Sequence, residues 1–220
     1  MIPKLVFAID TNKVDQAINL AKKAIIGGAD IIEAGTPLIK IGGVNIVYLL
    51  RKKYPSTPIY ADLKVIDFPE LEIIDYFSAG ASIVSLMAFT NNQNIIKALN
   101  LTKSYNKKIW VSTMGYYNTE LIKRVEELKR IGVDNIIAHG SGEQDCAFDD
   151  LIKKTKLISQ VNGIKLIVGG GITKSNIDKI LRYKPRVVIV GRGISMDKDI
   201  KTSTLSIKKR ILRYTNQERS

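Results

Sequence analysis

The feature that most constrains the fold is a strict alternation of short apolar runs with longer stretches of helical periodicity. The apolar runs, which we predict to be strands, cover residues 5–9, 31–33, 59–64, 82–87, 109–113, 135–138, 165–168 and 187–190. Apolar residues recur every three or four positions between them, which predicts helices over residues 14–25, 43–53, 69–79, 94–105, 119–131, 147–159, 174–181 and 200–213. Strands that are apolar almost throughout, each followed by a helix, indicate a parallel sheet covered on both faces.

Eight such units predict an α/β fold, a single (β/α)8 TIM barrel over residues 1–215, followed by a polar C-terminal tail at residues 216–220. An open, doubly wound sheet is the alternative arrangement. A chain of 220 residues, 45% of them hydrophobic, has the length and the apolar content of one such barrel. No linker or low-complexity segment indicates a second domain.

The formal net charge of +13 raises the question of nucleic-acid binding. The basic residues are spread along the chain, however, and the densest patch is only Lys208-Lys209-Arg210 with Arg213. Neither an aromatic RNA-binding motif nor zinc-finger spacing is present. We therefore interpret the charge as a solvated basic surface that helps to attract phosphorylated substrates. A non-enzymatic barrel that binds nucleic acid is the distant alternative.

The sequence contains no apolar run that approaches the roughly 18 residues of a membrane span. Residues 1–4 lead directly into strand-like sequence, so we expect neither a signal peptide nor a membrane partner. The single cysteine, Cys146, excludes an internal disulfide and fits the reducing cytoplasm, where we expect the protein. We expect Cys146 itself to lie in the core or in a helix.

Polar residues close several of the predicted strands. Asp10 follows the first strand, Glu33 ends the second, Asp62 and Lys64 end the third, and His139 follows the sixth. Because the carboxyl ends of barrel strands meet on one face, where barrel active sites lie, we expect these side chains to converge.

The end of the third strand carries the motif Asp62-x-Lys64-x-x-Asp67. Alternation along a strand places the side chains of Asp62 and Lys64 on the same face. Asp67 falls beyond the strand, just before Pro69, where a helix can begin. A lysine among carboxylates stays protonated and can stabilise a developing oxyanion, which makes these residues catalytic candidates. The alternative is a salt-bridged strand end.

Glu33 and Asp62, with Asp10 as a further candidate, can supply hard oxygen ligands. Since only carboxylates are available, we expect Mg²⁺ that keeps some of its waters. The alternative is that these carboxylates only balance the charge of Lys64.

His139 is the only histidine, so no multi-histidine metal site is possible. At a strand end it is a candidate proton carrier near neutral pH, with a structural role as the alternative. Ser112 and Thr113, which end the fifth strand, are candidates for hydrogen bonds to substrate.

Two glycine clusters, Gly169-Gly170-Gly171 and Gly191-Arg192-Gly193, follow the seventh and eighth strands. Backbone N–H groups without side chains can approach an anion closely, and barrels often bind phosphate at this position. Gly170, Gly171 and Gly191 are therefore candidate phosphate-binding residues, and Arg192 could add a bidentate contact. The alternative is that the clusters are only tight turns; the spacing does not fit a dinucleotide-binding fold.

Together, Asp10, the segment 32–39, the motif of residues 62–67, His139 and the glycine clusters resemble the orotidine 5′-monophosphate decarboxylase suprafamily over essentially the whole chain. Within it, the segment Glu-Ala-Gly-Thr-Pro-Leu-Ile at residues 33–39 is most similar to the 3-hexulose-6-phosphate synthases. These enzymes reversibly condense formaldehyde with ribulose 5-phosphate.

The resemblance implies a magnesium-dependent carbon–carbon lyase of the aldolase type, with the metal held by Glu33 and Asp62. It implies that Lys64 stabilises an enediolate and that His139 moves protons. It also implies a homodimer with shared active sites, in which Asp67 reaches the neighbour's site.

Two other activities of the suprafamily are the alternatives. The segments Asp67-Phe68-Pro69-Glu70 and Val190-Gly191-Arg192 are similar to orotidine 5′-phosphate decarboxylases, but those enzymes carry a lysine where Glu33 stands here. The 3-keto-L-gulonate-6-phosphate decarboxylases usually carry an arginine soon after the histidine, whereas the first arginine after His139 is Arg182. The segment from His139 to Gln144 is similar to the synthase pattern but one residue shorter.

Overall fold

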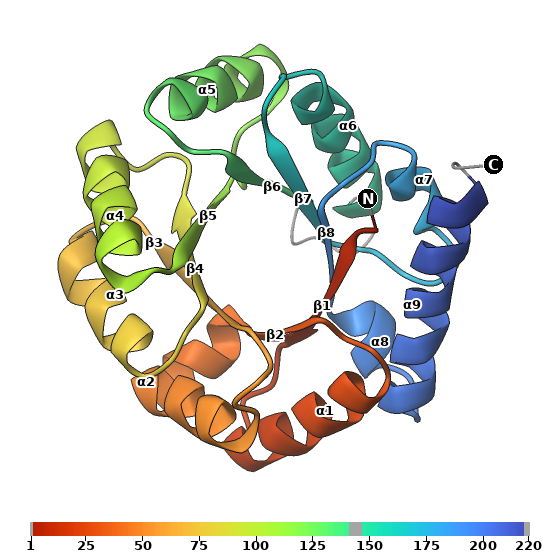
Figure 1. The fold of residues 1–220 in the computed structure, drawn as a ribbon. Coiled ribbons are helices and arrows are strands. Elements are labelled where there is room, and N and C mark those ends of the chain that lie inside the picture. Colours follow the sequence, from red (N-terminus) through yellow and green to blue (C-terminus); the bar gives the residue numbers. More distant parts are fainter. Residues whose placement is uncertain (1, 141–146, 218–220) are drawn as a thin grey trace.

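The computed structural model, which describes residues 2–140 and 147–217, is a closed barrel of eight parallel strands inside a ring of helices (Figure 1). Each strand pairs with the next in sequence, and β1 pairs with β8 to close the barrel. The (β/α)8 prediction is therefore confirmed, and the open sheet is excluded.

The strands are β1 Lys4–Ile9, β2 Ile31–Ala34, β3 Ile59–Val65, β4 Ile83–Met87, β5 Lys108–Ser112, β6 Asn135–His139, β7 Lys165–Gly169 and β8 Val187–Val190. The helices are α1 Val14–Ile26, α2 Thr36–Lys53, α3 Pro69–Ser78, α4 Asn92–Tyr105, α5 Asn118–Arg130, α6 Ala147–Ser159, α7 Asp178–Leu181, α8 Arg192–Ser195 and α9 Ile200–Gln217.

Some boundaries differ from the prediction. The helix after β2 begins at Thr36 rather than at residue 43, and a kink at Gly43, whose φ is 55°, interrupts it. The helix after β7 begins at Asp178 rather than at residue 174, because the Asn176 side chain holds the preceding turn. It accepts a hydrogen bond from the Thr173 N–H (2.8 Å) and donates one to the Gly171 carbonyl (2.9 Å).

The C-terminal region is more helical than predicted, since α9 continues through Asn216 and Gln217 of the expected tail. Residues 218–220 lie outside the described residues, as do Cys146 and the segment 141–144 that is similar to the synthase pattern. None of the described helices has the length and apolarity needed to cross a bilayer.

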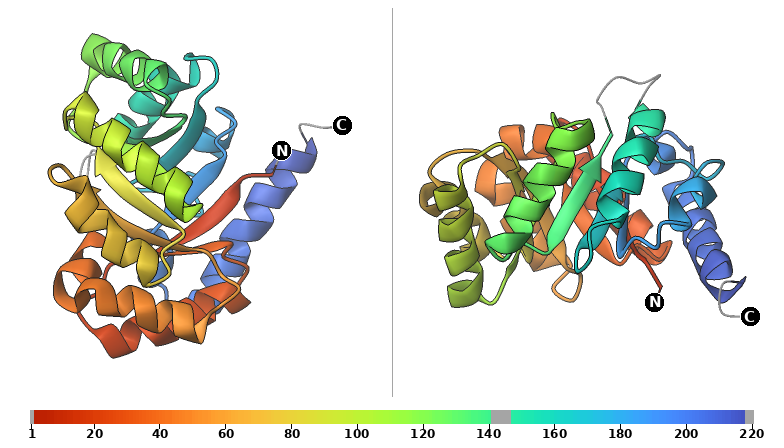
Figure 2. Two further views of the ribbon diagram at one scale, coloured as in Figure 1. Left: turned by 60° about the vertical axis from the view of Figure 1, so that its left-hand side comes forward. Right: turned by 90° about the horizontal axis from the view of Figure 1, so that it is seen from above.

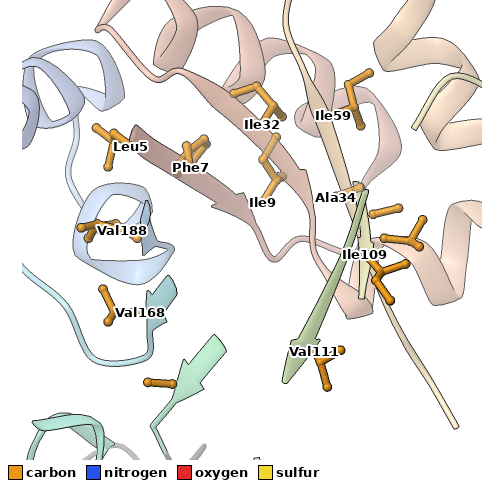
Figure 3. Close-up of a cluster of buried hydrophobic side chains, with 14 of the residues drawn as sticks. Leu5, Phe7, Ile9, Ile32, Ala34, Ile59, Ile109, Val111, Val168 and Val188 are labelled. Carbon is orange, nitrogen blue, oxygen red and sulfur yellow. The ribbon is translucent and has the colours of Figure 1, made fainter. Parts of the chain in front are cut away.

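The core has two layers because strand side chains alternate between the barrel interior and the helices. The outer layer lies between strands and helices, where Leu5, Phe7 and Ile9 of β1 all point (Figure 3). The inner layer fills the barrel with one side chain from each strand: Val6, Ile31, Tyr60, Ile83, Trp110, Ile137, Ile167 and Val187.

This inner layer determines where the polar residues lie. Two positions further along a strand, the side chain again points inward but is nearer the carboxyl end. Glu33 stands two residues after Ile31, and Asp62 two residues after Tyr60. We call the inner layer the apolar plug. The charged residues at the strand ends, which we call the charged layer, lie directly above it on the carboxyl-end side.

The last helix, α9, packs near the beginning of the chain. The start of β1 lies on the same side of the molecule as the end of α9 (Figure 2). α9 packs against α1, and its Lys208 forms an ion pair with Asp30. The Asp30 carboxylate also accepts a hydrogen bond from the Leu5 N–H (2.7 Å). Arg210 is paired with Asp178, so part of the densest basic patch is neutralised within the fold.

Trp110 is 3% exposed in the plug, and its ring centroid lies 4.6 Å from that of Tyr60. We expect Trp110→Ala to lower the free energy of unfolding by about 3–5 kcal/mol, because it leaves a cavity in a closed barrel. Urea unfolding followed by far-UV circular dichroism measures this, since Trp110 is the only tryptophan fluorophore. The control Leu205→Ala, on the exposed face of α9, should cost less than about 1 kcal/mol. Equal losses in the two variants would contradict the role of the plug.

Candidate active site

A cavity of about 470 Å³ opens at the carboxyl ends of the strands. Nine predicted site residues line it: Asp10, Glu33, Asp62, Lys64, His139, Gly170, Gly171, Gly191 and Arg192. The structure thus brings them together in one place, as the strand-end argument predicted. Three other predicted site residues, Asp67, Ser112 and Thr113, do not line this cavity.

Asp62 is the centre of the hydrogen-bond network in this cavity. Its Oδ1 accepts hydrogen bonds from the hydroxyls of Tyr60 (3.0 Å) and Ser85 (2.7 Å). Its Oδ2 accepts one from the Thr36 hydroxyl (2.8 Å) and forms an ion pair with the Lys64 ammonium. Burial alone would raise the pKa of Asp62, but Lys64 and the hydroxyls of Ser85 and Thr36 bring it below its ordinary value. The carboxylate is therefore charged at neutral pH.

Lys64 reaches the cavity through an irregular strand rather than by simple alternation. The segment Ala61–Val65 of β3 faces only Val84–Leu86 of β4, so β3 bulges. Lys64 has a φ of 53°, in the left-handed region, where a residue other than glycine costs roughly 1–3 kcal/mol. Its N–H donates to the Ser85 hydroxyl (2.9 Å), which anchors the bulge. The predicted shared face of Asp62 and Lys64 is correct, but the regular strand geometry behind it is wrong.

Glu33 carries a buried carboxylate oxygen, Oε2, that has no hydrogen-bond partner among the described residues. Burial, followed by the neighbouring charges of Asp62 and Asp10, raises the pKa of Glu33 well above its ordinary value. A cation beside Oε2 would give this oxygen a partner and would lower the pKa of Glu33.

The donor set of Glu33 and Asp62 fits Mg²⁺, which binds through one or two carboxylates and keeps several waters. A fuller cage is absent, because the described residues contain no group of three or more His, Cys, Asp or Glu side chains arranged around one metal position.

The Asp10 carboxylate lies between Gly35 and Gly191, and a larger residue at either position would displace it. A Cβ on Gly35 would lie 2.0 Å from Asp10 Oδ1, and a Cβ on Gly191 would lie 3.2 Å from Oδ2. Although the Asp10 side chain is open to the cavity, partial desolvation raises its pKa, and the charge of Asp62 adds to this effect. Arg192 and Lys64 oppose that rise.

His139 points inward from the end of β6, two residues after Ile137 of the plug. Its Nδ1 lies 3.3 Å from the Ser112 hydroxyl. Burial lowers the pKa of His139 to about 4, and the Lys64 cation contributes to the same shift. The imidazole is therefore uncharged at neutral pH and can accept a proton.

Neither of the hydroxyl residues predicted to bind substrate lines the cavity. Ser112 contacts His139 instead. Thr113 is fully buried, and its hydroxyl donates to the Ile137 carbonyl (2.8 Å), so the prediction for Thr113 is wrong. Thr113 is out of the inward register because it stands three positions after Trp110 of the inner layer, whereas Ser112 stands two positions after it.

The glycine clusters present free backbone donors to the cavity. Gly170 and Gly171 have φ values of 113° and 66°, and no described residue accepts a hydrogen bond from their N–H groups. A Cβ on Gly193 would lie 2.1 Å from the Ile172 carbonyl oxygen, so this turn is also tightly packed. The Arg192 guanidinium makes no hydrogen bond to another described residue. These groups can therefore surround an anion.

Asp67 is exposed outside the cavity, and its carboxylate accepts a hydrogen bond from the Phe68 N–H (2.9 Å). Three exposed apolar side chains lie near it in the sequence, and a fourth, Phe89, precedes Thr90, whose hydroxyl contacts the Ile66 carbonyl; we call Ile66, Phe68, Leu71 and Phe89 the apolar rim. The Ile66 carbonyl is held by the Asn94 side chain (3.0 Å) and by the Thr90 hydroxyl, so this segment has a defined position.

The sequence argument missed the hydroxyls that hold Asp62, namely those of Thr36, Tyr60 and Ser85. Two of them carry a recognisable signal. Tyr60 precedes Asp62 by two positions on one strand, and Ser85 lies two positions after Ile83 of the plug. Thr36 is the first residue of α2, at a helix start that the sequence prediction placed at residue 43, so no periodicity identified it.

The fold and this charged layer define an α/β-barrel with a polar site at the carboxyl ends of its strands. Residues 3–207 match the Orotidine 5′-phosphate decarboxylase / HUMPS family, and the chain belongs to that family.

Several proteins are similar over almost the full length. A 3-hexulose-6-phosphate synthase of Bacillus subtilis (strain 168) is 30% identical over 213 residues, which cover 95% of this chain and 98% of the relative. A solved 3-hexulose-6-phosphate synthase from Salmonella typhimurium has a TM-score of 0.86 at 28% identity, covering 96% and 99% of the two chains. A 3-keto-L-gulonate-6-phosphate decarboxylase from Vibrio cholerae shares the fold, with a TM-score of 0.80 at 22% identity and coverage of 97% and 99%.

His139 should make stability depend on pH. Its pKa is about 4 in the folded chain and near the ordinary 6.5 in the unfolded chain. Between these two pH values the imidazole is protonated in the unfolded chain but not in the folded chain. The stability contributed by neutral His139 is complete above pH 6.5 and is lost as the pH falls toward 4.

We therefore expect the wild type to lose up to about 3 kcal/mol more than His139→Gln between about pH 7 and about pH 4. Urea unfolding of both proteins across this range measures the difference, because their carboxylates titrate alike. Parallel pH curves would contradict the low pKa of His139.

Proposed function

We propose that the chain is a 3-hexulose-6-phosphate synthase, which reversibly joins formaldehyde to ribulose 5-phosphate through an enediolate. The observation that carries this proposal is the juxtaposition of Glu33 with the Asp62–Lys64 ion pair in one cavity. Relatives of the same name, similar over nearly the whole chain, support it. The enzyme would be a carbon–carbon lyase of the aldolase type. A cytoplasmic location is part of the proposal.

The substrate phosphate would bind at the free N–H groups of Gly170 and Gly171, with the Arg192 guanidinium as a counter-charge. Gly191 completes this side of the cavity. Anchoring the phosphate there extends the sugar chain toward the charged layer. The net charge of +13 favours the approach of an anionic substrate.

Glu33 and Asp62 would hold Mg²⁺, which supplies Lewis acidity to the hydroxyl and carbonyl oxygens of a ketose. The unpartnered Oε2 of Glu33 supports this assignment, since a buried carboxylate oxygen requires a donor or a cation. The four donors around Asp62 keep its carboxylate charged and oriented.

The Lys64 ammonium would stabilise the enediolate that forms when the C1 proton leaves ribulose 5-phosphate. His139, uncharged at neutral pH, or a cavity carboxylate such as Asp10, accepts that proton. The C1 carbon then bonds to the formaldehyde carbon, and the formaldehyde oxygen takes up a proton. In reverse, the same bond breaks and formaldehyde leaves.

Asp67 would act in the site of a second subunit, in a homodimer with shared active sites. Its exposed position outside its own cavity supports this role. The apolar rim supports it as well, because exposed apolar groups of this kind commonly mark a protein interface.

The deciding experiment measures formaldehyde-dependent consumption of ribulose 5-phosphate with added magnesium and after chelation. We expect turnover that requires the metal. The absence of turnover in both directions would refute the proposal. Turnover of orotidine 5′-phosphate would instead favour a decarboxylase and show that Glu33 does not exclude that reaction. Turnover of 3-keto-L-gulonate 6-phosphate would favour the other decarboxylase of the family.

Lys64→Ala should reduce kcat by at least about a hundredfold, because it removes the cation that stabilises the enediolate. Binding of inorganic phosphate, followed by calorimetry, should be retained, since the proposed phosphate site lies at the turns that follow β7 and β8. Lys53→Ala, at the exposed end of α2, is the matched control and should leave turnover unchanged. Unchanged turnover in Lys64→Ala would refute the assigned role.

Mixing two inactive variants tests the shared site. In a dimer of one Asp67→Asn and one Lys64→Ala subunit, one of the two sites carries neither change. Random reassociation should therefore restore about a quarter of the wild-type activity. If Asp67 acts in its own subunit or not at all, co-refolding the two variants will restore nothing beyond the activity of each alone.

A further inference from the structure

A lysine ammonium is buried directly behind the end of β6. Lys154 lies in α6 and is 1% exposed. Its Nζ donates a hydrogen bond to the His139 carbonyl (3.1 Å), forms an ion pair with Asp150 (3.1 Å) and lies 4.2 Å from the centroid of the Tyr117 ring. Lysine is almost never fully buried unless it is paired, because removing its charge from water is costly. Its position therefore requires an explanation.

The three contacts join elements that are separate in sequence. Asp150 and Lys154 belong to α6, Tyr117 immediately precedes α5, and His139 is the last residue of β6. The ammonium thus connects the end of β6 to α6 and to the residue before α5.

The contact between Lys154 and the His139 carbonyl can affect the orientation of the His139 side chain, because few contacts with the described residues fix the imidazole ring. Among the residues that the structure describes, the imidazole has one polar contact, at 3.3 Å from the Ser112 hydroxyl, which is long for a hydrogen bond. The direction of the ring is then set mainly by the backbone of His139. The carbonyl that Lys154 binds is part of that backbone.

The charges around His139 act in the same direction. Lys64 faces it from β3 and Lys154 from α6, and both disfavour a protonated imidazole. Asp62 and Asp150, which face it from the same two elements, oppose them. Removing Lys154 leaves the Asp150 carboxylate behind, so protonation of His139 becomes easier.

We propose that Lys154 is a positioning residue for His139. Its ammonium, held between Asp150 and the Tyr117 ring, fixes the His139 carbonyl and thereby the direction in which the imidazole meets the substrate. The consequence for turnover rests on the proposed function, whereas the consequence for the imidazole itself does not.

The single histidine makes a direct test possible, because its imidazole resonances in ¹⁵N-labelled protein can come from no other residue. Two variants separate the effects: Lys154→Met removes charge and donor, while Lys154→Gln removes the charge and keeps a donor for the carbonyl. The matched control is Lys153→Met, which removes an exposed lysine from the same helix.

We expect both Lys154 variants to raise the titration midpoint of His139 by at least about half a pH unit, since a nearby cation is lost. Lys154→Met should lower kcat by roughly tenfold to a hundredfold with little change in KM, because a misplaced proton carrier affects the chemical step. Lys154→Gln should retain more of kcat, and Lys153→Met should behave like the wild type. Urea unfolding of each variant reports any loss of stability separately.

Wild-type imidazole shifts and a wild-type midpoint in Lys154→Gln would overturn the proposal, even if that variant is less stable, because a purely structural lysine would act in this way. If Lys154→Met does not fold, the same readouts in Lys154→Gln decide. The two proposals can fail separately. If the wild type shows no aldol turnover but Lys154→Gln shifts the imidazole resonances and the titration midpoint of His139, the positioning of His139 is supported and the proposed function is refuted.

Discussion

The ion pair between Asp62 and Lys64 is the interaction on which the rest of the site depends. It rests on the apolar plug of the barrel, where an unpaired charge would be costly. Lys64 keeps Asp62 charged, and that charge helps to raise the pKa values of Glu33 and Asp10. Burial is the larger cause of both shifts, and the charge of Asp62 adds to it, so the ion pair influences the protonation of its neighbours. The hydroxyls of Thr36, Tyr60 and Ser85 hold Asp62 in place.

The position of this pair explains why the site faces one end of the barrel. Period-two alternation takes each strand from the plug to the polar layer in two residues. The bulge in β3 then brings the Lys64 ammonium to Asp62 in a backbone conformation that is unfavourable for lysine. Local strain of this kind, maintained by a rigid surrounding structure, is common at sites that bind or transform ligands.

Much of this could be predicted from the sequence, because it follows from short-range patterns. Alternating runs identified the barrel, and strand-end polarity identified Glu33, Asp62 and His139. The features that were missed depend on residues distant in the chain or on particular side chains. The bulge at Lys64 depends on pairing with β4, and the late start of α7 on the Asn176 side chain. Likewise, helical periodicity placed Lys154 in a helix, but its contact with the His139 carbonyl depends on how α6 packs against β6.

Asp10 shows how the barrel joins the two ends of the chain. Its carboxylate lies between Gly35, near the beginning of the sequence, and Gly191, near its end. During synthesis on the ribosome, the chain has therefore made all but its last helices before both walls around Asp10 exist. The cavity cannot be assembled in stages from the N-terminus, so a growing chain has no complete binding site until the eighth strand closes against the first.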